Sequence, residues 1–178
     1  MKKLKGSKTE QNLLTALHGE SLARNKYSYF ASKAKKEGFV QIAKIFEETS
    51  ENEKEHAKIW FKLIDKIGST KENLISSVKT EGYEAREMYP NFAKTAKEEG
   101  FDDIAKIFIK ISEVEAEHEK RYKKLLSNIN NDTVFQSGEE EEWICLNCGY
   151  IHKGKAAPEE CPLCSHARAY FARHRDIV

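Results

Sequence analysis

Apolar residues recur at intervals of three and four along most of the first 127 residues, which is the spacing of one face of an α-helix. One such face runs up to Gly38-Phe39 and another follows it, and the same arrangement flanks Gly100-Phe101. Glycine readily adopts the left-handed conformation that ends many helices. The pattern therefore predicts four helices, joined as two hairpins.

The two predicted hairpins are copies of one another. Residues 37–58 and 99–120 are identical at 14 of 22 positions at an offset of 62. Two hairpins with apolar stripes pack most simply as an all-α four-helix bundle. The join between them, roughly residues 67–79, is then expected to cross the bundle.

The overall composition excludes several classes of protein. The chain of 178 residues carries 30 basic and 29 acidic side chains, a net charge of +1, and 39% of its residues are hydrophobic. This balance argues against binding to nucleic acid or to a membrane surface. No apolar run reaches the length of a membrane span, and the lysine-rich N-terminus leads into a polar stretch rather than a signal-peptide core. We expect a cytoplasmic protein.

Carboxylates occupy positions where the helical pattern predicts apolar residues. They lie on or beside the inward stripes, at Glu20, Glu53, Glu81, Glu84 and Glu115. A buried carboxylate must be protonated, paired or metal-bound, because burying its charge alone costs several kcal/mol. No matching set of inward lysines or arginines is present. Bound cations are the simplest counter-charge.

Spacing identifies the kind of cation site. Glu53-x-x-His56 and Glu115-x-x-His118 each place a carboxylate and an imidazole on one helix face, 15 residues beyond the hairpin glycine. Glu20, Glu81 and Glu84 lie 16 to 19 residues before theirs. At about 1.5 Å per residue, all four helices bring ligands to one layer. One glutamate from each of two helices and Glu-x-x-His from each of the others describes a carboxylate di-iron site, and oxygen with imidazole suits iron or manganese.

The simpler interpretation of these residues is structural. A single Glu-x-x-His on a helix is usually a solvated surface pair, but two at equivalent positions of a repeat, with inward glutamates on the partner helices, favour metal. Tyr27 and Tyr89 would pack in such a bundle, and their hydroxyls could also hydrogen-bond ligand carboxylates.

The repeat changes register near these glutamates. Arg24 matches Arg86 at an offset of 62, whereas Glu20 matches Glu81 at 61. The third helix thus has one additional residue, which helices usually absorb as a π-bulge, often at functional sites. We predict a π-bulge near residues 81–86.

All four cysteines lie in the last 34 residues, as Cys145-x-x-Cys148 and Cys161-x-x-Cys164. In a cytoplasmic protein such pairs are metal ligands more often than disulfides. Four thiolates form a tetrahedral site for iron or zinc. The flanking Gly149-Tyr150 and Cys161-Pro162 favour a rubredoxin-like iron site. We interpret residues 128–142 as a linker and 143–178 as this small metal domain.

The combination of motifs resembles the rubrerythrin family over essentially the whole chain. Those motifs are Glu20, Glu53-x-x-His56, Glu81-x-x-Glu84 leading to Met88-Tyr89-Pro90, Glu115-x-x-His118 and the two cysteine pairs. The resemblance implies a ferritin-like di-iron domain over residues 1–127 and a C-terminal rubredoxin-like domain. By the resemblance, Glu53 and Glu115 bridge the two irons and Glu20 and Glu81 are terminal ligands. His118 would bind one iron, and Glu84 and His56 would alternate on the other as its oxidation state changes.

The resemblance also implies an activity. Members of the family are non-haem di-iron peroxidases that reduce hydrogen peroxide to water, with electrons relayed through the rubredoxin-type iron. A homodimer or higher oligomer and an electron-donor protein, of the rubredoxin or flavoprotein reductase type, are implied partners. Two alternatives stay open at this point: a ferroxidase or iron-storage relative of ferritin, and a non-enzymatic zinc-ribbon protein.

Overall fold

The computed structural model describes residues 3–65 and 67–176. The chain divides into two units, one up to Ile67 and one from Gly68 onward. The first unit is a helical hairpin, and the second contains another hairpin and a small domain of three strands. Each is described by itself.

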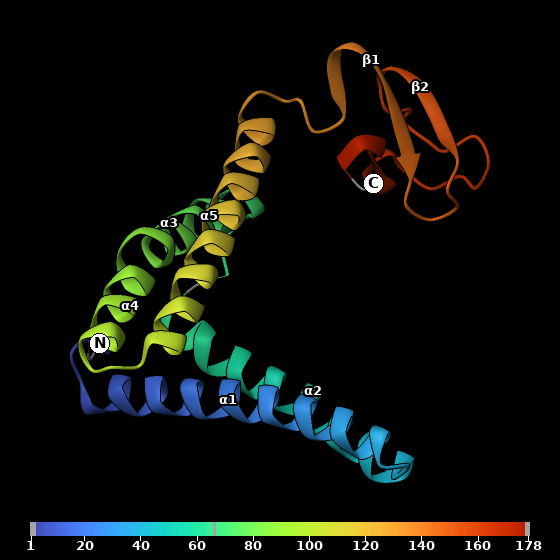
Figure 1. The fold of residues 1–178 in the computed structure, drawn as a ribbon. Coiled ribbons are helices and arrows are strands. Elements are labelled where there is room, and N and C mark those ends of the chain that lie inside the picture. Colours follow the sequence, from blue (N-terminus) through green and yellow to red (C-terminus); the bar gives the residue numbers. More distant parts are fainter. Residues whose placement is uncertain (1–2, 66, 177–178) are drawn as a thin grey trace. The chain divides into compact units, whose positions relative to one another are not determined.

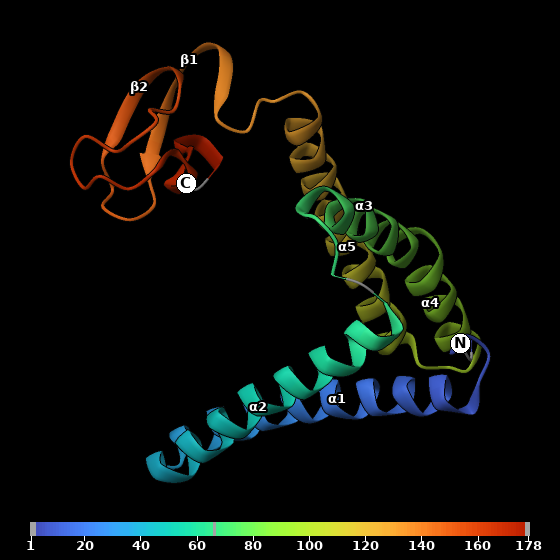
Figure 2. The same ribbon diagram turned by 180° about the vertical axis from the view of Figure 1, so that it is seen from behind.

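The first hairpin consists of α1 (Lys8–Lys36) and α2 (Val40–Ile64), which lie side by side along their length (Figures 1 and 2). The Ser7 side chain caps α1 by accepting a hydrogen bond from the backbone N–H of Glu10. Gly38 joins the helices with a φ of +84°. The N–H of Phe39 reaches back to the carbonyl of Ala34, 2.9 Å away, which closes the Schellman turn that ends α1.

The second hairpin repeats this design with an interruption. Its first arm comprises α3 (Thr70–Tyr83), a π-helix (Glu84–Met88) and α4 (Tyr89–Glu98), and its second arm is α5 (Asp102–Asn130). Gly100 has a φ of +85°, and the N–H of Phe101 bonds to the carbonyl of Ala96 at 2.8 Å. The bend is therefore the same Schellman turn as at Gly38. The π-helix confirms that the additional residue of the third helix is absorbed as a π-bulge, displaced slightly toward the C-terminus from the predicted range.

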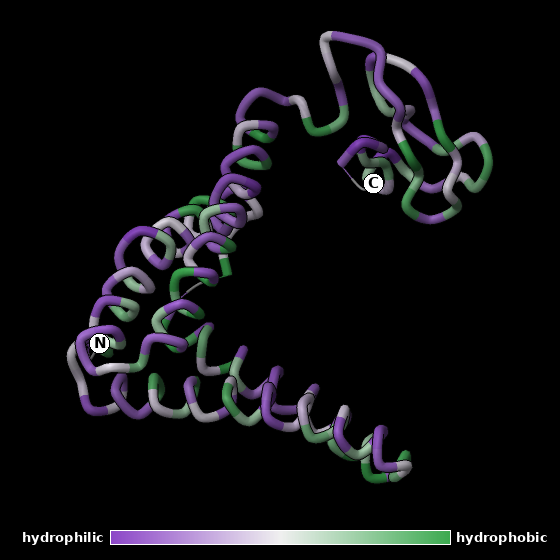
Figure 3. The backbone as a smooth tube through the Cα atoms, in the orientation of Figure 1, coloured by the Kyte–Doolittle hydropathy of each residue, from purple (hydrophilic) through white to green (hydrophobic). Residues whose placement is uncertain are grey.

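Small residues fill the contact between the helices of each hairpin. Ala31, Ala34 and Ala43 are buried in the first hairpin, and Ala93, Ala96 and Ala105 are buried at the equivalent positions of the second. Ala57 and Ala85 are also buried. Among the residues that the structure describes, no hydrophobic side chain larger than alanine is buried in either hairpin. Apolar positions nevertheless recur along all the helices (Figure 3). Each hairpin thus has close helix packing but little core of its own.

The C-terminal domain has the largest buried side chains of the described chain. Strands β1 (Gln136–Cys145), β2 (Ile151–Ala156) and β3 (Phe171–Arg173) form an antiparallel sheet in the order β2-β1-β3. Two short 3-10 helices, Arg168–Tyr170 and His174–Asp176, flank β3. The core consists of Trp143, Cys145, Ala157, Cys161 and Phe171.

Arg173 contacts both the core of the C-terminal domain and the segment that connects α5 to the sheet. Its guanidinium carbon lies 5.4 Å from the centre of the Trp143 ring, a cation–π contact. Its Nη2 also donates to the carbonyls of Thr133 and Gln136, at 2.7 and 2.8 Å. The residues between α5 and β1 are therefore held by the sheet that follows them.

The predicted fold class is confirmed: four helices of the ferritin-like kind, built as a duplicated hairpin, precede a small four-cysteine domain. One connection differs from the sequence-based expectation. The segment predicted as a linker, 128–142, is helical up to Asn130 and belongs to β1 from Gln136. The join over residues 67–79, whose helical content the sequence left open, is mostly helix, because α3 begins at Thr70. None of the described helices is long and apolar enough to cross a membrane.

Candidate metal centres

The first hairpin brings three of the predicted ligands together. Glu20 comes from α1, and Glu53 and His56 come from one face of α2; their ligand atoms all lie within 4.8 Å of one another. His56 Nδ1 is 3.0 Å from an oxygen of Glu53. We call this group the first cluster.

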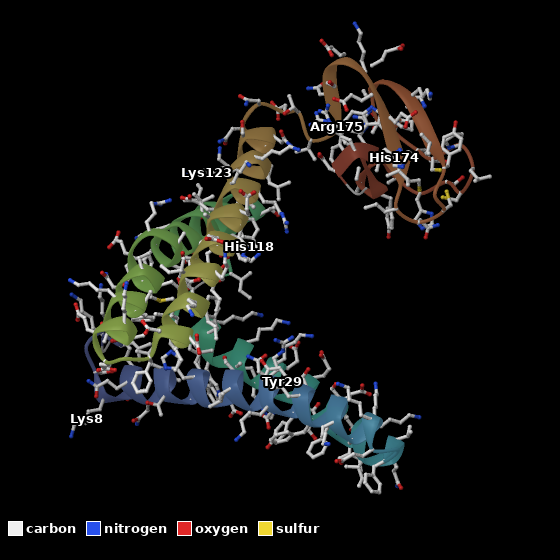
Figure 4. The ribbon with its side chains drawn as sticks, viewed as in Figure 1. Lys8, Tyr29, His118, Lys123, His174 and Arg175 are labelled. Carbon is white, nitrogen blue, oxygen red and sulfur yellow. The ribbon has the colours of Figure 1, made fainter. Side chains whose placement is uncertain are left out.

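The second hairpin forms the equivalent group, the second cluster, from Glu81 of α3 and Glu115 and His118 of α5. His118, labelled on α5 in Figure 4, places its Nδ1 2.7 Å from Glu115 and 3.4 Å from Glu81. Six of the seven predicted carboxylate and histidine ligands thus lie in two matching groups of three.

The carboxylates in each cluster lie too close to be ionised together. A hydrogen bond shared with Glu53 is the main reason that the pKa of Glu20 is raised, while the same hydrogen bond lowers the pKa of Glu53. Burial, followed by the proximity of Glu115, raises the pKa of Glu81. Two carboxylates that share one site retain a proton unless a cation replaces it. Both clusters therefore have the charge and ligand types that suit a divalent metal ion.

Glu84 stands apart from these groups. It is the first residue of the π-helix and is half-buried, but its carboxylate is not among the ligand atoms of the second cluster. It is close enough to raise the pKa of Tyr89. The structure thus places Glu84 beside the second cluster rather than in it.

The two tyrosines differ in their surroundings. Both pack on a phenylalanine with ring centres 6.1 Å apart, Tyr27 on Phe46 and Tyr89 on Phe108. Burial and then Glu115, Glu84 and Glu81 raise the pKa of Tyr89. Tyr89 is thus the tyrosine whose hydroxyl lies near ligand carboxylates, and Tyr27 is a packing residue in this hairpin.

Trp60 is a further neighbour of the first cluster, which the motifs of the sequence do not include. Its indole Nε1 is buried without a hydrogen-bond partner in the described part of the chain, yet it lies near enough to Glu20 to lower the pKa of that carboxyl. The equivalent residue of the second hairpin is Tyr122. Trp60 lies one turn beyond His56 on the same face of α2, and this position could have identified it from the sequence as a neighbour of the cluster.

The four cysteines converge in the C-terminal domain. Cys145 and Cys161 are buried, and the sulfurs of Cys145 and Cys164, like those of Cys148 and Cys161, are 3.7 Å apart. A tetrahedral ion with metal–sulfur bonds of about 2.3 Å has sulfurs about 3.8 Å apart. The spacing of the thiols therefore fits a tetrahedral metal site.

Two similar turns present these sulfurs. Gly149 and Ser165 each follow the second cysteine of a pair, and both have positive φ, +77° and +56°. The N–H groups of these two residues bond back to the carbonyls of Cys145 and Cys161, at 2.8 and 2.9 Å. The sequence pattern Cys-x-x-Cys thus corresponds to one repeated backbone turn.

The packed thiols influence one another's protonation. Burial opposes the ionisation of Cys164, but a backbone hydrogen bond from His166, the neighbouring thiols and Asn147 lower its pKa to about 6. A backbone hydrogen bond from Tyr150 lowers the pKa of Cys148, but burial and the other three thiols outweigh it and raise that pKa to about 12. Metal binding would replace the protons that this group holds.

A duplicated carboxylate–histidine hairpin followed by a four-cysteine domain defines a class of non-haem metalloproteins with two kinds of metal centre. Comparison with protein families specifies it. Residues 11–126 match the rubrerythrin family model, and residues 143–172 match the model of the rubrerythrin rubredoxin-like domain. This chain belongs to the rubrerythrin family, whose members have a di-iron site and a rubredoxin-like iron site.

Individual relatives are similar in sequence to this chain over nearly their whole length. Rubrerythrin-1 of Clostridium acetobutylicum is 48% identical, with 96% of each chain covered. Rubrerythrin of Porphyromonas gingivalis is 50% identical, with 96% of this chain and 92% of the relative covered. Among solved structures, nigerythrin in a partially reduced state is 31% identical over 96% of this chain and 91% of its own, with a TM-score of 0.37.

Proposed function

We propose that this protein is a non-haem di-iron peroxidase that reduces hydrogen peroxide to water, with electrons relayed through the four-cysteine iron. One observation carries the proposal: two matching carboxylate–histidine clusters occur in a chain that also has a tetrahedral thiol site. Reduction of hydrogen peroxide is the known role of the rubrerythrin family to which the chain belongs. An electron-carrying centre suits an enzyme that must be reduced again after each turnover.

In this proposal the residues of the first and second clusters, Glu20, Glu53, His56, Glu81, Glu115 and His118, would hold the iron ions. Glu84 would be a further carboxylate that could exchange with His56 as a ligand. The position of Glu84 beside the second cluster is compatible with that role, because the π-helix places its carboxylate near the ligands without fixing it among them.

When bound, a pair of iron ions would supply two-electron reduction and Lewis-acid chemistry for cleavage of an O–O bond, and an iron on the four cysteines would supply one-electron transfer. The side chains around the site control protons and geometry. The phenol of Tyr89 is protonated at neutral pH, its pKa is raised further by burial and by the nearby carboxylates, and it can donate a hydrogen bond toward Glu81, Glu84 or Glu115. The indole of Trp60, whose Nε1 is buried, offers a second neutral N–H donor near Glu20.

The proposal is tested by reducing the iron-loaded protein under anaerobic conditions and mixing it with hydrogen peroxide or with oxygen. The visible absorption of thiolate-bound ferric iron reports the four-cysteine site. We expect this band to return rapidly with peroxide and much more slowly with oxygen. A faster response to oxygen would favour an oxidase or iron-storage role, and a colourless protein would indicate zinc in the cysteine site.

A further inference from the structure

Three residues around the π-helix meet at one place in the second hairpin. Arg86 donates to both carboxylate oxygens of Glu119, at 2.7 and 3.0 Å. Gly82 lies against both side chains, because a Cβ at this position would overlap each of them. Gly82 and Glu119 are both buried. We call Gly82, Arg86 and Glu119 the register group.

The same place in the first hairpin is a groove. Among the residues that line this groove are Ser21, Arg24 and Ala57. These three positions correspond to the register group, at an offset of 61 for Ser21 and of 62 for Arg24 and Ala57. The two hairpins thus share the arginine, but the first has an alanine where the second has the buried carboxylate that pairs with it.

The change of offset locates the additional residue of this arm. Because Gly82 has the offset of 61 and Arg86 has that of 62, the additional residue lies between them, on the C-terminal side of Glu81. This location makes Glu81 a member of the second cluster. If the additional residue preceded Glu81, Gly82 would take the position that corresponds to Glu20, and glycine has no side chain to bind a metal ion.

The register group opposes such a shift. Moving the additional residue to a point before Glu81 would bring Tyr83 to the place that Gly82 occupies. Tyr83 is 52% exposed, and its side chain would enter the space that the guanidinium of Arg86 and the carboxylate of Glu119 fill. The buried carboxylate would then lose its two-pronged partner, which is unfavourable for a charged group.

We propose that the register group holds the π-helix in place and thereby selects Glu81 as the ligand of the second cluster. Its members are positioning residues, because they act on Glu81 through the helix. π-Helices are rare and occur mostly as single-turn bulges, so the surrounding structure must stabilise this one. The same restraint keeps Glu84, the first residue of the π-helix, beside the cluster. The proposal rests on the proposed function only in taking the second cluster as part of a metal site.

Titration with cobalt(II) tests the selection of the ligand. Cobalt bound by carboxylates and imidazole absorbs differently from cobalt bound by thiolates, so the two kinds of centre are followed separately. Glu119→Ala gives the second hairpin the residue that the first has at Ala57. We expect the carboxylate–histidine centre of this variant to bind cobalt about tenfold more weakly and to show a changed absorption band, because Glu81 is no longer held in position. Binding to the cysteines should be unchanged.

The repeat provides a matched control. Arg24 is equivalent to Arg86, and it donates to Asn25 of its own helix at 3.4 Å. Arg24→Gln should leave the cobalt affinity and absorption unchanged, whereas Arg86→Gln should reproduce the effect of Glu119→Ala. Combining Arg86→Gln with Glu119→Ala should weaken binding no further, because both substitutions remove the same ion pair. Additive losses, or equal effects of the two arginine variants, would overturn the proposal.

Hydrogen–deuterium exchange of the metal-free protein tests the hold on the π-helix without any bound metal. We expect Glu119→Ala to exchange faster than wild type in residues 81–88 and at the wild-type rate in residues 20–26 of the first hairpin. Equally faster exchange along both hairpins would indicate a general stabilising role and contradict the proposal. Wild-type protein that binds cobalt only on its cysteines would contradict the proposed function rather than the hold on the π-helix.

Discussion

Arg86 and Glu119 form a two-pronged ion pair between the π-helix and α5. The guanidinium Nη1 and Nη2 lie 2.7 and 3.0 Å from the two carboxylate oxygens. Glu119 is buried, directly follows His118, and also contacts Lys123 at 3.0 Å. Bidentate geometry of this kind fixes orientation as well as distance. The pair therefore holds the π-helix of the second hairpin against α5, the helix that carries Glu115 and His118.

Gly82 makes room for this ion pair. A Cβ at Gly82 would overlap Nη2 of Arg86 and a carboxylate oxygen of Glu119. We expect Gly82→Ala to destabilise the protein by about 1–3 kcal/mol, as overpacking does, and to weaken iron binding at the second cluster. Thermal unfolding and iron titration would check this.

Gly19→Ala is the matched control, because Gly19 also lies within a helix but has open space around its Cβ position. That substitution should stabilise the protein by about 0.5–1 kcal/mol. Equal behaviour of the two variants would contradict the steric explanation.

The ion pair should also make stability depend on pH in the acid range. Hydrogen bonds from Arg86 and Lys123 lower the pKa of Glu119 from 4.5 to about 2. A carboxylate with a lowered pKa in the folded protein contributes stability above its unfolded pKa and loses that contribution as the pH falls through the folded value. Metal-free wild type should therefore be more stable than Glu119→Gln at neutral pH. The difference should shrink between about pH 4.5 and pH 2, and a constant difference in acid denaturation would refute the assignment.

Tyr89 and Tyr27 should respond differently to removal of their hydroxyls. Both tyrosines pack on a phenylalanine, but only Tyr89 has its pKa raised by nearby Glu115, Glu84 and Glu81 in addition to burial. We expect Tyr89→Phe to slow the reaction with peroxide and to shift the optical spectrum of the oxidised di-iron site, since a hydrogen bond to a ligand is lost. Tyr27→Phe should leave both unchanged. The reverse order in rapid-mixing kinetics would show that the first hairpin provides the relevant hydroxyl.

Metal removal should unfold the C-terminal domain and spare the helices. Cys145 and Cys161 are part of its small core, so the bound ion and the packing support each other. A chelator that strips the four-cysteine site should abolish the tertiary signal of Trp143 while the helical circular dichroism persists. If the helical circular dichroism were lost together with the Trp143 signal, the helices would not be independent of the C-terminal domain, and the prediction would be wrong.

The turn glycine of the first cysteine pair provides a sharper test of that domain. Gly149 has a φ of +77° and open space around its Cβ position, so Gly149→Ala should cost about 1–2 kcal/mol from backbone strain alone. Ser165 has the equivalent conformation at +56° without being glycine, and Ser165→Gly should therefore slow metal loss. Competition with a chelator would measure the rate of metal loss from each variant. Slower metal loss from Gly149→Ala than from wild type would exclude the backbone explanation.

The sequence predicted most of the site because the chemistry is repeated. Glu53-x-x-His56 and Glu115-x-x-His118 recur at equivalent positions, and the change in offset between Glu20 and Glu81 predicted the π-helix. The connection was not predictable in the same way. Residues 70–79 have a weaker apolar pattern than the other helices, and the helix start at Ser69 depends on side-chain caps rather than on periodicity. The roles of Trp60 and Glu119 depend on tertiary neighbours that no local pattern reveals.

The π-helix has a consequence for the symmetry of the molecule. The additional residue is confined to the π-helix, so the face of α3 before it stays directed at α5. Glu81, and not Gly82 at the repeat offset of 62, therefore joins Glu115 and His118, as Glu20 joins Glu53 and His56. The insertion thus preserves the match between the two clusters and adds Glu84 beside only one of them.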